Sequence, residues 1–282
     1  MGTSSSYGGP GGTGALLPPW APTADSPEPA ATVTVPPGSA PGATPSPPQA
    51  VPPQTSWSAP KNSLSRYASS GGSGNRTGRA YLKSAVRGFV GAQGGSRRAA
   101  RAARGGIATV QGLGGFLSAI STRGTSAAVR EYRLENYLDK SADSLLTAIV
   151  DQIAPDGAQL EEAAARAAAV ETLSELFVEQ GVDGDGLTAL EHLTADEIRA
   201  VMGRFLCRYI FERLIQTLGK TLENRPAAEV VRLESGVKSY LNATIRLDLS
   251  NVDVTTMDWK GPAGRELVTR LYEEAYELME NV

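Results

Sequence analysis

Apolar positions recur at helical spacing through the second half of the chain. In residues 126–153 they keep a helical rhythm, until the Pro-Asp-Gly sequence at 155–157 breaks the pattern. Such spacing places apolar side chains on one face of an amphipathic helix. A second, Ala-rich helix is predicted over residues 161–180, closed by Gly181, because glycine readily adopts the left-handed conformation that ends helices.

The most apolar helix is predicted to begin after Thr194. Thr194 suits the N-cap position, and acidic residues follow it in the first turn. We expect this helix to form the centre of the core. Its apolar residues are Ile198, Val201, Met202, Phe205, Leu206, Tyr209, Ile210, Leu214 and Leu218.

Residues 244–254 follow a different pattern, in which apolar and polar residues alternate. This alternation predicts a strand or an extended segment. Gly261 and Pro262 then open a last amphipathic helix. The predicted fold class is therefore mainly α, with a helical body over residues 126–282 that includes at most one short strand.

A long Gly/Pro/Ser-rich N-terminal arm is predicted to be disordered. Residues 1–60 contain few aliphatic side chains, and their prolines remove backbone hydrogen-bond donors. Too little apolar surface is available to offset the loss of chain entropy on folding. We divide the arm into a Gly-rich tip at residues 1–20 and a linker at residues 21–75.

The tip differs from the linker in composition. Gly2 is small enough for the initiator Met to be removed, which would expose an unhindered glycine amine. Behind it lie Tyr7 and an apolar cluster of Leu16, Leu17 and Trp20. We expect the tip to enter a narrow pocket of a partner, although an ordinary disordered terminus fits the composition equally well. The tip also matches the short myristoylation pattern, which we regard as a chance match because one acyl chain anchors a protein only marginally.

Charge is unevenly distributed, although the net charge is only −3. Residues 61–130 contain twelve Lys or Arg and no acid, whereas residues 131–282 contain 15 basic and 28 acidic residues. We predict a basic, Gly/Ala/Arg-rich helical segment at residues 76–125. Several guanidinium groups are expected on one helical face there, from Arg97, Arg98, Arg101 and Arg104. They could contact nucleic-acid phosphates, or dock on the acidic half of the chain or an acidic partner; charge complementarity favours docking.

Few residues carry candidate chemistry. The chain has one Cys, Cys207, and one His, His192, which argues against disulfides, a Cys- or His-based metal site and a Ser/His/Asp triad. Cys207 is expected to be a buried, inert thiol, and His192 a surface or capping residue. No cofactor and no catalytic site are predicted.

The acidic motifs are interpreted structurally. Residues 183–186, Asp-Gly-Asp-Gly, lack the glycine and glutamate that a calcium loop needs at its sixth and twelfth positions, and they favour a tight turn. The pairs at 161–162 and 273–274 are interpreted as solvated helix faces. No apolar run approaches the length of a membrane span, and no signal peptide is visible, so we expect a cytoplasmic protein without membrane partners.

The N-terminus resembles a known family. Residues 1–10, Met-Gly-Thr-Ser-Ser-Ser-Tyr-Gly-Gly-Pro, and the Leu-Leu-Pro-Pro-Trp-Ala sequence at 16–21 are similar to the opening of the B component (QatB) of the bacterial four-gene Qat anti-phage system. The segment at 78–124 and the Phe-Leu-Cys-Arg-Tyr-Ile sequence at 205–210 are also similar to that family.

The resemblance implies a protein that acts through partners. Qat systems combine this component with a P-loop ATPase (QatA), a QueC-like enzyme (QatC) and a TatD-like nuclease (QatD). By analogy, the QueC-like enzyme would join a 7-deazaguanine group to the amine of Gly2. The residues held in its cleft would be Thr3, Ser4, Tyr7, Gly8, Gly9 and Pro10, and the neighbouring anchor would be Leu16, Leu17 and Trp20.

Two hypotheses follow. In the first, the chain is a non-enzymatic defence component whose N-terminal tip is recognised and modified by the QueC-like partner. In the second, it is a nucleic-acid-binding adaptor or scaffold that uses its Arg-rich segment.

Overall fold

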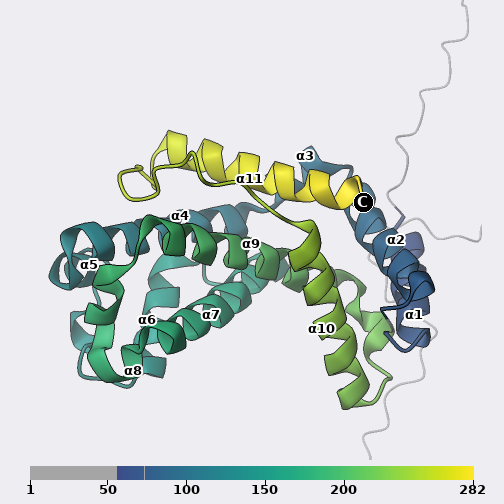
Figure 1. The fold of residues 1–282 in the computed structure, drawn as a ribbon, viewed down its shortest axis with the longest axis horizontal. Coiled ribbons are helices and arrows are strands. Elements are labelled where there is room, and N and C mark those ends of the chain that lie inside the picture. Colours follow the sequence, from purple (N-terminus) through teal and green to yellow (C-terminus); the bar gives the residue numbers. More distant parts are fainter. Residues whose placement is uncertain (1–55, 73) are drawn as a thin grey trace, which may run out of the picture. The chain divides into compact units, whose positions relative to one another are not determined.

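A computed structural model of the chain describes residues 56–72 and 74–282. The tip and most of the expected linker lie outside these residues. Within them, the chain forms α-helices and short 3-10 helices and no strand (Figure 1). The α-helices are α1 (Ser58–Ser69), α2 (Arg76–Ala92), α3 (Ser96–Ala102), α4 (Arg104–Arg123), α5 (Thr125–Glu131), α6 (Ala142–Ile153), α7 (Leu160–Gln180), α8 (Val182–Asp185), α9 (Ala195–Leu218), α10 (Ala227–Thr244) and α11 (Pro262–Glu280). The 3-10 helices are η1 (Glu135–Tyr137), η2 (Gly186–His192) and η3 (Gly219–Leu222).

Helix α1 occupies part of the segment that the sequence assigned to the linker. It packs along α2 and also contacts α9 and η3. Leu64, Tyr67 and Ala68 are buried in these contacts. The prediction of a disordered linker up to residue 75 therefore differs from the structure over residues 58–69, because these three side chains supply apolar surface that the Gly/Ser composition around them obscured.

Helix α4 is central to the packing. It contacts α5, α6, α7, α9 and α11, and its glycines permit close approach. A Cβ atom on Gly114 would lie 2.6 Å from the Trp259 ring, and one on Gly112 would lie 2.6 Å from the Ile153 carbonyl oxygen. The glycines that look like helix breakers in the sequence are thus positions where bulky neighbours touch the α4 backbone.

The predicted helix over residues 126–153 is interrupted in the structure. Helix α5 ends where Arg133 adopts a left-handed conformation with φ of 54°, and the Leu134 amide donates to the Val129 carbonyl. This is the hydrogen bond of a Schellman end, and it is accompanied by complete burial of Leu134. The side chain of Ser141 then caps α6. The apolar positions were identified correctly, but they do not belong to one helix. Leu134 is buried by the turn that ends α5 and not by a continuing helix.

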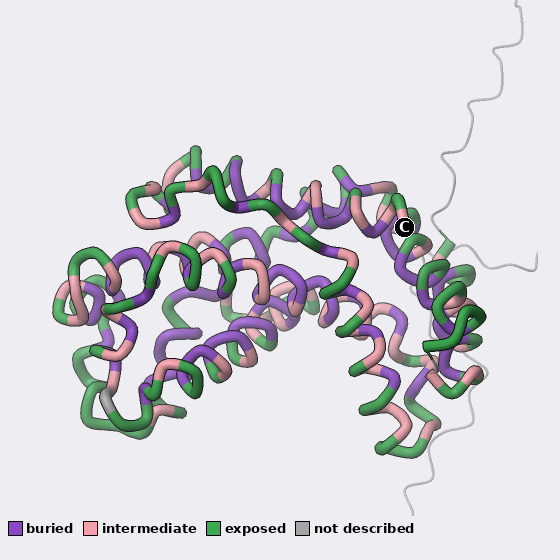
Figure 2. The backbone as a smooth tube through the Cα atoms, viewed as in Figure 1, coloured by how far each residue is buried: buried purple, intermediate pink, exposed green. Residues whose placement is uncertain are grey.

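The helix boundaries around the core agree with the sequence. Gly181 closes α7 in the left-handed conformation, and Pro262 stands in the first turn of α11. Thr194 caps α9 in a capping box with Glu197. As predicted, α9 carries the largest set of core side chains, and it packs along α7. Figure 2 shows buried positions recurring along these helices.

The strand predicted within residues 244–254 is absent from the described chain, which corrects that expectation. Thr244 is the last residue of α10, and residues 245–249 follow as an extended segment, the alternative that the alternation allowed, before a turn at Ser250 and Asn251. Ile245, Leu249 and Val254 are buried against the helices. The carbonyl groups farther along accept hydrogen bonds from side chains, not from a neighbouring strand: Arg199 donates to the Val252 oxygen and Ser118 to the Thr255 oxygen.

Candidate functional site

The tip residues proposed as a modification and partner-binding site lie outside the described residues. These are Gly2, Thr3, Ser4, Tyr7, Gly8, Gly9, Pro10, Leu16, Leu17 and Trp20. Their role stays a prediction from the sequence.

The Arg-rich segment is divided between two helices. Arg97, Arg98 and Arg101 lie on α3, and Arg104 begins α4. The break falls at Ala103, whose side chain is buried. The segment is therefore two helices where one helical face was expected, although Arg98, Arg101 and Arg104 still line one cavity. The chain leaves the helical conformation at the buried Ala103, and the Ala/Arg repeat in the sequence does not predict this break.

Part of this segment contacts the acidic C-terminal helix. Helix α3 packs on α11, and Arg97 Nε lies 2.7 Å from Glu273 Oε1. The backbone amide of Ser96 donates to Glu280 at 3.3 Å. The Arg97 side chain is 77% exposed, so this ion pair contributes little to stability. These contacts match the docking alternative for Arg97.

The other three arginines border a surface cavity of about 580 Å³. Gln159, Glu161 and Glu162, at the start of α7, also line it. The cavity thus presents both charges. It could hold a ligand that carries an anionic group next to hydrogen-bond donors.

Glu161 is not the solvated residue that the sequence suggested. Its carboxylate accepts the backbone amides of Gly105 and Gly106 at 2.9 and 3.1 Å, and the Tyr209 hydroxyl at 2.5 Å. It therefore caps the N-terminus of α4 from another helix, where a negative charge is favourable. The available sequence signal was the Arg-Gly-Gly start of α4, which has no side chain able to cap the helix itself.

Three tyrosines lie behind this cap. Tyr209, Tyr272 and Tyr276 are fully buried, and the Tyr209 and Tyr272 rings meet edge to face at 5.2 Å. Burial raises the pKa of all three hydroxyls, so they remain protonated. Within the described chain, the hydroxyls of Tyr272 and Tyr276 have no hydrogen-bond partner.

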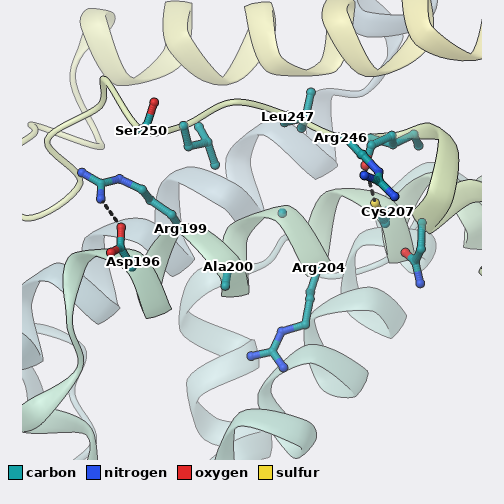
Figure 3. Close-up of a pocket in the computed structure, with 12 residues that line it drawn as sticks. Asp196, Arg199, Ala200, Arg204, Cys207, Arg246, Leu247 and Ser250 are labelled. Carbon is teal, nitrogen blue, oxygen red and sulfur yellow. Dashed lines mark hydrogen bonds and ion pairs between the residues drawn. The ribbon is translucent and has the colours of Figure 1, made fainter.

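A groove of about 480 Å³ runs between α9 and the extended segment (Figure 3). Gly203 lines the groove, and a Cβ atom added to this glycine would have no neighbour within 4 Å. Arg199 is fixed at one end by Asp196 and by the Val252 carbonyl. Arg246 lies on the extended segment and is exposed.

Cys207 borders this groove but is poorly suited to act as a nucleophile. It is only 9% exposed, and its thiol faces the Ile245 carbonyl at 3.9 Å. Burial raises the thiol pKa to about 11, so the reactive thiolate is scarce at neutral pH. The predicted burial of the thiol is confirmed, and its low reactivity stays a prediction.

A second charged cluster joins α7, α9 and α10. Arg204 binds Glu179, Arg208 binds Glu175, and Lys238 binds Glu171 at 2.8 Å. The Lys238 ammonium also lies 4.8 Å from the centre of the Phe211 ring. Arg204 Nε and Arg208 Nη1 are nevertheless buried without a hydrogen-bond partner in the described chain. We interpret the ion pairs of this cluster as contacts that join the three helices.

The remaining candidates show no metal chemistry in the part of the chain that the structure describes. No group of three or more His, Cys, Asp or Glu residues could hold a metal ion there. Residues 182–185 form the short helix α8, where a turn was expected, and His192 is exposed at the end of η2. None of the described helices is both long and apolar enough to cross a membrane.

Comparison with known proteins gives one informative result. No curated protein and no solved structure matches the chain. One family model, described as Qat anti-phage system associated protein QatB, matches residues 94–279. The match begins just before α3 and ends within α11, so it contains the Glu161 cap, the tyrosines and the groove. Because it spans more than half of the sequence, the chain belongs to the QatB family of Qat anti-phage system components.

Proposed function

We propose that this QatB-family protein is a non-enzymatic component of its defence system whose N-terminal tip is the substrate of a QueC-like partner enzyme. Membership of the family supports a role in the anti-phage system. The observation that carries the finer proposal is the sequence Met1-Gly2 at the head of a Gly-rich tip.

The chemistry suits a glycine amine. After removal of Met1, the Gly2 amine would attack the activated carboxyl carbon of a 7-deazaguanine derivative. An N–C bond forms, the activating group leaves with its bonding electrons, and the amine loses a proton. Such an attack needs close, in-line approach, and glycine offers no side chain to obstruct it.

The position of the tip supports this role. More than fifty residues separate Gly2 from the start of α1 at Ser58. An extended chain covers up to about 3.5 Å per residue. The partner could therefore bind the tip while the helical body is bound elsewhere in the assembly, through the QueC-like enzyme (QatC), the P-loop ATPase (QatA) or the TatD-like nuclease (QatD).

The body supports a non-enzymatic role through its candidate nucleophile. The Cys207 thiol is buried, and its pKa is raised to about 11. A catalytic cysteine needs a lowered pKa and access to substrate.

Intact-mass measurement of the protein co-expressed with the QueC-like component tests the proposal. We expect a mass increase on the N-terminal peptide that disappears when that component is omitted. Gly2→Leu should prevent the increase, because leucine blocks both removal of Met1 and approach to the amine.

Gly38→Leu is the matched control, since it makes the same substitution within the arm but away from the terminus. It should be modified like the native protein. An unmodified N-terminus in a system that still protects cells, or a modification that maps elsewhere, would refute the proposal.

A further inference from the structure

The α1–α2 hairpin has an unusual charge. Helices α1 and α2 pack side by side, and residues 58–92 contain six Lys or Arg and no acid. Four of these lie on α2, at positions 76, 79, 83 and 87. Intervals of three, four and four residues place them within roughly an 80° arc and along about 16 Å of the helix. We call Arg76, Arg79, Lys83 and Arg87 the α2 cationic stripe.

The stripe is exposed and electrostatically unsatisfied. All four side chains are exposed. Within residues 56–72 and 74–282, none of the four takes part in an ion pair or a side-chain hydrogen bond, whereas Arg97 and Arg123 in the same basic block have carboxylate partners. Bringing four like charges together on a helix is unfavourable unless a polyanion neutralises them.

The surroundings of the stripe favour one kind of polyanion. The large exposed apolar residues of the described chain are Tyr137, Leu138, Leu160, Val170, Val178 and Val231, and all lie outside the hairpin. A protein partner would ordinarily bury apolar or aromatic anchors at the centre of its interface. A membrane surface would require an exposed apolar face on the helix.

A nucleic-acid duplex requires neither. Its affinity comes mainly from cations that neutralise backbone phosphates. The aromatic rings of the hairpin are occupied: Trp57 packs against Phe89, and Tyr81 lies beneath the Arg66 guanidinium. They are therefore poorly placed to stack on the bases of a single strand.

We propose that the α2 cationic stripe binds the phosphate backbone of duplex DNA without reading its sequence. The four residues lie before residue 94, where the family match begins. The stripe also differs from the Arg-rich segment of α3, whose Arg97 is paired with Glu273. The proposal does not depend on modification of Gly2.

Fluorescence anisotropy with a labelled duplex of random sequence tests this site on the full chain. If about four phosphates are neutralised, the logarithm of affinity should fall with the logarithm of salt with a slope of about −3 to −4, or roughly a hundredfold between 50 and 200 mM salt. Replacing all four stripe residues with Gln should weaken binding by about tenfold or more at 50 mM salt and flatten the slope. Gln preserves helix propensity, and circular dichroism would verify the fold.

A matched variant separates a local site from general charge. Arg130, Lys140, Arg265 and Arg270 are exposed and lie outside the hairpin. Changing these four to Gln alters the net charge equally and should leave affinity within about twofold. Equal weakening by both variants would overturn the proposal. Failure of the chain to bind the duplex at 50 mM salt would also overturn it. If the stripe bound poly-glutamate and not the duplex, the surface would be assigned to an acidic protein partner.

Discussion

The Tyr209 hydroxyl donates a hydrogen bond of 2.5 Å to Glu161 Oε1, which links α9 to α7 at the start of α4. The same carboxylate accepts the amides of Gly105 and Gly106. One side chain thus joins the first turns of α4 and α7 to the middle of α9. This contact lies inside the family-matched region and explains how α4 can begin at an Arg-Gly-Gly sequence.

Removing this carboxylate should destabilise the body. Glu161→Ala leaves two backbone amides and the Tyr209 hydroxyl without their acceptor, and we expect a loss of roughly 2–3 kcal/mol in the free energy of unfolding by urea. Glu162→Ala is the control. Within the described chain, the Glu162 carboxylate accepts the Gln159 backbone amide at 3.2 Å and no amide of α4, so a loss of about 1 kcal/mol or less is expected. Equal losses would show that the cap is not important.

The buried tyrosines should respond differently to loss of their hydroxyls. Tyr209→Phe removes the donor to Glu161 and should cost about 1.5–3 kcal/mol. Tyr272→Phe removes a fully buried hydroxyl that has no partner in the described chain, so it should be neutral or stabilising. Thermal unfolding of the two variants checks the order. A larger loss for Tyr272→Phe would reveal a partner of that hydroxyl and contradict this account.

Two helical glycines provide a test of close packing. A Cβ atom on Gly114 would lie 2.6–2.9 Å from atoms of the Trp259 ring, so Gly114→Ala should destabilise the protein by about 1–3 kcal/mol. Gly203 lies within α9 and has open space above it. Gly203→Ala should therefore stabilise the protein by about 0.5–1 kcal/mol, through helix propensity alone. Chemical denaturation measures the free energy of unfolding of both variants. We expect changes of opposite sign, and a change of the same sign in both variants would contradict this account of the packing.

The reactivity of Cys207 should follow its burial. Its pKa is raised to about 11 in the folded protein, so the stability that the protonated thiol contributes is complete below the ordinary thiol pKa and is lost as the pH rises through 11. Alkylation by a small reagent at pH 8 should be at least about tenfold slower in the native protein than in urea. Mass spectrometry follows this directly, because the chain has one cysteine. Equal rates would mean that the thiol is accessible.

The sequence predicted those elements whose signals are local. The capping residue Thr194, the glycine at 181 and the apolar stripe of α9 each act through neighbours close in sequence. The same was true of Pro262 at the start of α11. A mainly helical body could therefore be predicted correctly.

The errors arise where distant residues decide the structure. Glu161 looked solvated because its partners, Gly105 and Tyr209, are far away in the sequence. The alternation near Ile245 suggested a strand, but no neighbouring strand exists in the described chain and the helices receive its apolar side chains. The cationic block was visible in the sequence, yet only the fold separates the paired Arg97 from the unpaired stripe on α2.

The central claim concerns the amine of Gly2, and phage protection by the complete four-component system tests it most directly. Plating efficiency of phage would be compared for cells carrying native protein, Gly2→Leu, or Gly38→Leu. We predict full protection by the native protein and by Gly38→Leu, and loss of protection by Gly2→Leu while its helical body remains folded. Undiminished protection by a folded Gly2→Leu protein would contradict the account.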